Sequence, residues 1–356
     1  MPQYQVFDAE DRIIETTKVT TGYFSDGSGT LTGANMISAS LTASQDKYYT
    51  NIRKTGTTND EFSVTFGNRT GVGSSDVTGH TKAIYQYYAD LLLFPDEIEN
   101  TGFQFVSGST DANIFVLAAE RARMKDRLNR KNWTLVLGGT TGSAFNTPYP
   151  NGLTLTDDSA YTVPTATPAG PRYNVVSGAA GVAKGNTATG GFYAAGHPFG
   201  YFYPNLGLVV LGGAPMSGTL PGSHVTCGSV KDGGGDLTTA GIGFSIDTAT
   251  TAKNHLKFFQ SLRSGSFTAR SEEDQITTSY FVRARAAHFN FSNNPTFFSG
   301  SDATFAIKEF TGNPQTFITT IGLHDAQGTC VAVGRLSTPV LKNFSTEFTA
   351  KVNLVH

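Results

Sequence analysis

The sequence has few cysteines, no long apolar run and no signal-peptide pattern, and each of these shortages argues against a class of protein. Two cysteines in 356 residues, Cys227 and Cys330, cannot form a disulfide framework. We expect both to be reduced, small and at least partly buried. No apolar stretch approaches the roughly 20 residues that cross a bilayer, and the opening Met-Pro-Gln-Tyr-Gln lacks the basic start and apolar run of a signal peptide. The sequence predicts a protein made in a cytosol, without membrane insertion.

Charge is scarce and balanced. The chain carries 26 basic and 28 acidic residues, a net charge of -2, whereas nucleic-acid-binding domains show a strong basic excess. Charged residues make up only 15% of the chain, against about 25% in ordinary soluble domains. Because a surface with little charge is poorly solvated, we expect partner subunits to cover much of it.

Glycine and phenylalanine are abundant, with 40 and 26 residues, and glycine follows no strict period. This composition is typical of short strands joined by tight turns. We predict an α+β, mainly β fold with short antiparallel sheets, about two helices, a loop-rich β insertion and a C-terminal β-sheet block. The length predicts two domains. We place a mixed α/β core in 1–137 with 256–356, and a Gly/Thr/Pro-rich β insertion with long loops in 138–255.

Hydrophobic periodicity predicts helices over 81–94, which Pro95 ends, and over 111–128, for which Asp111 is the N-cap. The start of the second helix, 114–116, is equally compatible with a strand. Helical spacing returns briefly at 252–262. Strands are expected at 61–67 (half-buried), 133–137, 173–177, 200–203 and 206–211.

The C-terminal block, 276–356, contains alternating strand patterns that we expect to form one continuous sheet. The apolar face changes after Ala284, and a bulge near Ala286-Ala287 explains the change. Two strands, 316–323 and 329–336, flank a hairpin turn at 325–328. The terminal strand places four apolar residues on one face: Phe348, Ala350, Val352 and Leu354.

Residues that carry chemistry are sparse, and we predict no catalytic residue, cofactor or metal. No two histidines have metal-site spacing, and His324-Asp325 suits a hairpin turn. Neither a nucleophile elbow nor a phosphate loop is present. The dense carboxylates, Asp157-Asp158 and Glu272-Glu273-Asp274, are interpreted as solvated loops. Asp232 and Asp236 flank a glycine run but lack the spacing of an EF-hand.

One basic cluster stands out. Between residues 120 and 131 six cations face two anions, a local charge of +4. Such a run can contact a phosphate backbone, form the solvated face of a helix, or dock an acidic partner. We rank the last two above nucleic acid. The candidate partner-docking face consists of Arg121, Arg123, Lys125, Arg127 and Arg130.

Several segments, taken together and in order, are similar to a family of virion structural proteins of contractile-tailed bacteriophages (myoviruses) of the marine and cyanobacterial type. These segments are 81–93, 114–128 with Asn132-Trp133, 172–178, 200–207, 269–273, 290–295 and 336–342. The resemblance implies a tail or baseplate component without catalytic residues. The Gly- and Ala-rich loops 179–199 and 212–250 match nothing in the family.

We therefore expect a non-enzymatic subunit of a contractile-tail baseplate, in its wedge region, that contacts other tail subunits as part of a symmetric multi-copy assembly. The expected location is the virion, after synthesis in the host cytoplasm. Three alternatives stay open. One is a neck, tail-fibre-attachment or capsid-decoration protein. Another is a receptor- or glycan-binding module that uses Tyr193, Tyr201 and Tyr203. The third is a virion-associated hydrolase that uses Asp157 or Glu273.

Overall fold

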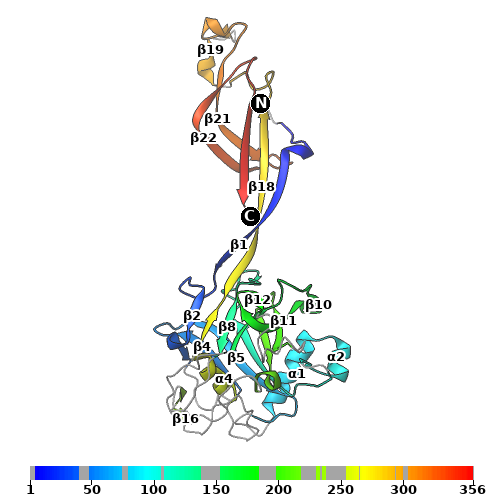
Figure 1. Cartoon of the computed structure of the whole chain (residues 1–356). Helices are drawn as coiled ribbons and strands as arrows, with labels where there is room; N and C mark the ends of the chain where they lie inside the picture. The colour runs from blue at the N-terminus through cyan, green and yellow to red at the C-terminus, as the bar shows by residue number, and fades with distance from the viewer. Residues whose placement is uncertain are drawn as a thin grey trace. The chain divides into compact units, whose positions relative to one another are not determined.

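Antiparallel strands dominate the computed structural model, which confirms the mainly β prediction. The structure describes residues 5–39, 48–73, 79–105, 108–137, 153–183, 198–217, 230–232, 235–237, 254–263, 265–292, 294–299 and 304–355. The chain divides into two units (Figure 1). Unit 1 comprises Met1–Lys18 and Asp274–His356, and unit 2 comprises Val19–Glu273. Strands β1 (Arg12–Gly22) and β18 (Arg270–Ala284) contribute residues to both units.

Unit 2 is built around one large sheet that is nearly closed into a barrel. Its strand order is β2-β17-β8-β9-β11-β13-β14-β6-β5-β4-β3. The bounds are β2 (Thr30–Thr32), β3 (Met36–Ser38), β4 (Tyr49–Lys54), β5 (Asp60–Asn68), β6 (Asn113–Ala119), β8 (Thr134–Leu137), β9 (Leu153–Asp157), β11 (Gly170–Ala179), β13 (Gly200–Tyr203), β14 (Leu208–Gly212) and β17 (Ser266–Thr268).

Unit 2 also contains smaller elements. Short strands β10 (Thr165–Thr167) and β12 (Val182–Ala183) pair with β11, and β7 (Arg127–Leu128) pairs with β18. A separate hairpin joins β15 (Val230–Asp232) to β16 (Gly235–Leu237). The helical elements of unit 2 are α1 (His80–Leu92), α2 (Pro95–Asn100), α3 (Gly213–Ser217), α4 (Asn254–Arg263) and the 3-10 turn η2 (Gly33–Asn35).

The core of unit 2 lies on both faces of the sheet. On β6, Phe115 and Leu117 belong to one apolar cluster, whereas Ile114 and Val116 belong to another that contains residues of α1. Strand β5 is buried on both faces because α1 packs against it, so the half-buried prediction was wrong. At Gly67 a Cβ atom would lie 3.1 Å from the backbone nitrogen of Tyr85, and a side chain there would push the helix away.

The helix predictions over 81–94 and 252–262 are confirmed by α1 and α4. Pro95 ends one helix and also begins the next, because it occupies the first position of α2. The Glu97 carboxylate then caps α2 by accepting a hydrogen bond from the Phe94 backbone nitrogen at 3.0 Å.

The predicted helix over 111–128 is wrong. Residues Asn113–Ala119 form β6, which pairs with β5 and β14 and is therefore a central strand. A continuous apolar run rich in aliphatic and aromatic residues is typical of a strand that is buried on both faces. Burial on both faces therefore determines the structure of this segment, and the helical spacing of its apolar residues does not. Asp111 accepts a hydrogen bond from the Asn113 backbone nitrogen at 3.1 Å, as a turn residue. The strand alternative for 114–116 was right.

The described residues of unit 1 form three sheets rather than the single continuous sheet predicted, and the smallest pairs β19 with β20, residues 298–299 with 304–305. In one, β18 lies between β1 and β23 (Phe348–Val355), with Thr277 opposite Val355 and Ala284 opposite Phe348. In a second, β21 (Thr316–His324) pairs with β22 (Cys330–Lys342), and the two form a two-stranded ribbon among the described residues. The remaining elements are η1 (Ala9–Asp11), η4 (Pro295–Phe297), η5 (Lys308–Phe310), β19 (Phe298–Ser299) and β20 (Thr304–Phe305).

The details of unit 1 correct some predictions and confirm others. Strand β18 ends at Ala284, and Ala286-Ala287 lie in a turn in which the His288 nitrogen donates to the Arg285 carbonyl at 3.0 Å, so no bulge is present there. The hairpin at 325–328 is confirmed, and the Asp325 carboxylate accepts from the backbone nitrogens of Gln327 and Thr329. Phe348, Ala350, Val352 and Leu354 share one face of β23, as predicted, and that face is half-buried. Cys330 is exposed, contrary to prediction, and Cys227 lies outside the described residues.

The division of the chain also differs from the predicted domains. Strands β9, β11, β13 and β14, from the expected insertion 138–255, stand between β8 and β6 in the large sheet. Because their hydrogen-bonded neighbours come from the expected core, these segments form one unit with residues 19–137 and 256–273 of it, whereas the rest of the expected core belongs to unit 1. Most of loops 179–199 and 212–250 lies outside the described residues.

Candidate functional site

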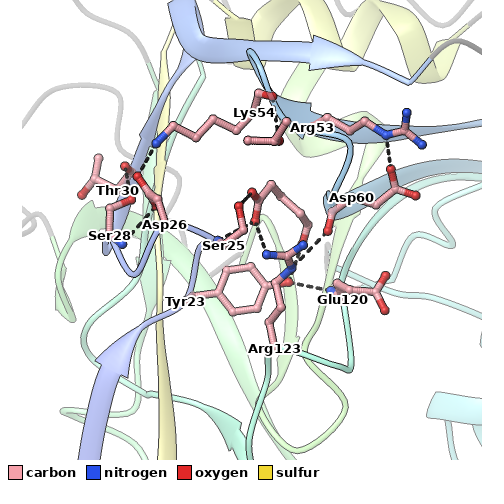
Figure 2. Close-up of polar contacts among 12 residues, drawn as sticks. Tyr23, Ser25, Asp26, Ser28, Thr30, Arg53, Lys54, Asp60, Glu120 and Arg123 are labelled. Carbon is pink, nitrogen blue, oxygen red and sulfur yellow. Dashed lines mark hydrogen bonds and ion pairs between the residues drawn. The ribbon is translucent and has the colours of Figure 1, made fainter.

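The predicted basic docking face lies in a turn of unit 2, after β6 and through β7, and not on a helix. Arg123 is partly buried there and contacts two groups. Its Nη1 lies 3.3 Å from Oε2 of the fully buried Glu61, and its Nε donates to the Asp60 carbonyl at 3.1 Å. Figure 2 shows the Arg123 side chain between Tyr23, Ser25 and Asp60. Arg123 therefore neutralises an interior carboxylate.

Tyr23 and Ser25 complete this cluster. The Tyr23 hydroxyl donates to the Glu61 carbonyl and accepts from the Glu120 backbone nitrogen at 2.5 Å, and Ser25 donates its backbone nitrogen to Glu61 Oε2 at 3.0 Å. Burial raises the pKa of Tyr23 above its usual range. The cluster joins the β1–β2 connection to β5 and to the turn after β6, which is a structural role.

The other cations of this face are also paired within unit 2. Arg127 contacts Glu272 through Nε at 2.7 Å and Nη2 at 2.6 Å, and Lys125 lies 2.8 Å from Glu273. Arg121 donates to backbone carbonyls of its own turn, and Arg130 contacts the Tyr173 hydroxyl. Only Arg121 and Lys125 of the five are exposed. A docking role for this face stays a prediction. Its positive charge is largely neutralised by acidic residues of unit 2.

The carboxylates interpreted as solvated loops are buried, so that interpretation was wrong for Asp157, Asp158 and Glu272. Both Asp157 and Asp158 are 0% exposed. Asp157 accepts from the Lys131 backbone nitrogen at 3.0 Å, and Asp158 accepts from the backbone and side-chain nitrogens of Asn174 at 3.0 and 2.9 Å. These carboxylate oxygens hold loops against the sheet, because they accept hydrogen bonds from backbone nitrogens in place of carbonyl oxygens.

Two of the tyrosines considered for glycan binding make hydrogen bonds within unit 2. The Tyr203 hydroxyl is buried and donates to the Leu92 carbonyl at 3.2 Å, and the Tyr201 hydroxyl donates to the Gln104 carbonyl at 2.9 Å. Arg172 lies 4.4 Å from the centre of the Tyr201 ring and pairs with Glu97 at 3.1 Å. Burial raises the pKa of both tyrosines. Tyr193 lies outside the described residues.

Metal chemistry finds no support in the part of the chain that the structure describes, where no three His, Cys, Asp or Glu side chains gather. Asp232 and Asp236 belong to the small β15–β16 hairpin, in which Lys231 faces Asp236. Among the described residues no helix is long and apolar enough to span a membrane.

Unit 1 holds the feature that best fits a functional surface. Its large apolar side chains are exposed on strands and turns, including Phe291, Phe317, Val331, Val333 and Phe344. The β21–β22 ribbon is exposed along most of both strands. A two-stranded ribbon is at best marginally stable in water, so its apolar side chains need a covering surface.

An apolar cavity of about 1310 Å³ opens within unit 1. Phe281, Phe297, Ile321 and Leu323 line its interior, and side chains that are themselves exposed border it. The bordering residues are Val6, Phe291, Ile307 and Phe317. We call this cavity and its lining the groove.

One buried carboxylate also lines the groove. Asp11 is 5% exposed, and its Oδ1 lies 2.9 Å from Nε of Arg283 but has no hydrogen-bond partner. Its other oxygen, Oδ2, accepts from the Asp8 backbone nitrogen at 3.3 Å. The ion-pair distance and the missing hydrogen bond are compatible, because the pair is close but poorly aligned.

Sequence reasoning did not find the groove. The available signal was density rather than periodicity, because seven phenylalanines fall between residues 289 and 317. These rings pack mainly on one another, as in the contacts of Phe297 with Phe291, Phe298, Phe305 and Phe310.

Comparison of the chain with protein-family models, with curated proteins and with solved structures finds no match.

Proposed function

We propose that the protein is a non-enzymatic structural subunit of a bacteriophage virion, a component of the contractile-tail baseplate in its wedge region. The observation that carries the assembly role is the exposure of apolar strands in unit 1. Apolar surface of this kind marks protein–protein contacts. The assignment to a virion rests on the resemblance of segments 81–93, 114–128 and 336–342 to the phage tail family.

The chemistry of unit 2 agrees with a structural role. The carboxylates that motivated a hydrolase, Asp157 and Glu273, are engaged with Lys131 and Lys125. The hydroxyls of Tyr201 and Tyr203 are hydrogen-bonded within unit 2, which weakens the case for a glycan-binding module. A neck, fibre-attachment or decoration protein would share the assembly surface, and its position in the particle distinguishes it from a baseplate subunit.

Mass spectrometry and cryo-electron microscopy of purified phage particles test the proposal. We expect the chain in stoichiometric amount, as density in the tail at the baseplate. Absence from the particle contradicts the virion role, and density at the neck or capsid contradicts the baseplate assignment alone.

A further inference from the structure

Unit 1 has a second apolar surface apart from the groove. Val331, Val333 and Arg335 alternate along β22, and none of them lines the groove. Val333 is paired with Gly322 and Arg335 with Thr320, and cross-strand partners share a face. Gly322 and Thr320 also border the groove, but Ile321 and Leu323, the buried residues of β21 in its interior, lie on the opposite face of that strand. Same-face residues repeat at about 6.6 Å along a strand. We call Val331, Val333 and Arg335 the ridge.

The ridge combines two apolar side chains with one cation. Val331 is 64% exposed and Val333 is 65% exposed. Arg335 is exposed, and it makes no ion pair or hydrogen bond within the parts of the chain that the structure describes. The ridge can therefore contact an apolar surface through its two valines and an acidic group through its guanidinium.

The groove offers the complementary chemistry. Its border is apolar, and its lining includes the Asp11 carboxylate, whose Oδ1 is buried without a hydrogen bond. The ion pair of Arg283 with Asp11 is close but poorly aligned, so Oδ1 still lacks a hydrogen bond. An occupant that brings a cationic donor beside apolar side chains supplies one.

We propose that the ridge of one copy of this chain seats in the groove of a second copy, with Arg335 directed to Asp11. The inference rests on the proposed assembly role and names its partner. Because ridge and groove are different surfaces, the contact is head-to-tail and generates a ring or a filament. Like copies do not repel strongly, since unit 1 carries eight Lys/Arg and nine Asp/Glu, a net charge of -1.

Light scattering coupled to size-exclusion chromatography of the purified full chain tests the contact. Wild type is expected to form oligomers. Val333→Asp on the ridge and Ile307→Asp at the groove border are each expected to give monomers. Both positions are exposed, so the fold tolerates the change, which circular dichroism checks. Val163→Asp is the matched control, because Val163 is 90% exposed and belongs to unit 2, and it is expected to assemble as wild type.

Mixing the two monomeric variants tests directly whether the ridge pairs with the groove. The Val333→Asp copy keeps an intact groove and the Ile307→Asp copy keeps an intact ridge, so one sound contact forms and a 1:1 complex appears. A symmetric patch-to-patch contact gives no such rescue. Continued monomers on mixing overturn the proposed pairing of ridge with groove.

The charge contact has its own measurement. Arg335→Glu is expected to raise the dissociation constant by at least about tenfold, whereas Arg335→Lys keeps the charge and has a smaller effect. An unchanged constant for Arg335→Glu overturns the role of Asp11. A wild-type chain that stays monomeric yet occurs in phage particles overturns the second-copy inference and leaves the proposed function standing.

Discussion

Unit 2 buries apolar side chains on both faces of its sheet, whereas unit 1 leaves them on exposed strands. Among the described residues, the buried apolar side chains of unit 1 are Ala284, Phe297, Ile321 and Leu323, and all others belong to unit 2. The two units draw on the same antiparallel strands and similar residues. The difference lies in what covers the strands, since helices and neighbouring strands cover them in unit 2. A strand pattern alone therefore does not say whether its apolar face closes a core or an interface.

Hydrogen exchange of the chain alone should show the largest contrast. Amides of β5 and β6 lie in the interior of the large sheet, and their exchange requires unfolding that costs about 5–15 kcal/mol. Amides of the β21–β22 ribbon open at little cost. We expect protection factors lower by about a thousandfold or more in the ribbon. Equal protection in dilute solution would mean that unit 1 is stable without a partner.

Truncation of a buried side chain should give the next largest difference in stability between the two units. Phe115 packs on Phe66 and Phe258, with ring centres 5.2 Å apart in both pairs. Phe115→Ala is expected to lower the free energy of unfolding by about 3–5 kcal/mol. Phe344→Ala in unit 1 removes an exposed ring and should change it by about 0.5 kcal/mol at most. Urea denaturation measures both, and a comparable loss at Phe344 would reveal a hidden core in unit 1.

The sequence predicted elements better than it predicted their surroundings. Helices α1 and α4 and the hairpin at 325–328 could be read from local spacing and turn residues, because those signals are local. The strand β6 was missed because its apolar run has neither period, as a strand covered on both faces requires.

The candidate site was predictable only in part. The basic residues of 121–130 could be recognised from their charge alone. Their acidic partners Glu61, Glu272 and Glu273 are far away in sequence, so the neutralisation of that charge could not be predicted. The groove depends on Asp11 meeting a C-terminal segment, and no local pattern records that contact.

Alkaline pH should weaken unit 2 selectively. Burial raises the pKa of five tyrosines, all in unit 2: Tyr23, Tyr85, Tyr88, Tyr201 and Tyr203. Above the unfolded pKa of about 10 the unfolded chain loses protons that the folded chain keeps, so stability falls as pH rises. Each such tyrosine contributes up to about 1.4 kcal/mol per pH unit.

Urea midpoints at pH 9, 10 and 11 measure this loss, and Tyr23→Phe should make the slope shallower. A pH-independent midpoint for wild type would show that these hydroxyls ionise freely in the folded state.

The smallest effect on stability, and the cleanest test of the basic face, is expected at Lys125. The Lys125 side chain is 42% exposed, so its ion pair with Glu273 contributes less than about 1 kcal/mol. Arg123 and Arg127 are unsuitable probes, because each neutralises a buried carboxylate and its loss also destabilises the fold. Lys125→Met should therefore fold as wild type in a thermal melt. If this face docks a partner, the variant should be incorporated into particles less efficiently than Lys82→Met, a second single-charge change at an exposed position of unit 2. Normal incorporation would identify the exposed end of this face as merely solvated, and would leave unit 1 as the surface through which the chain assembles.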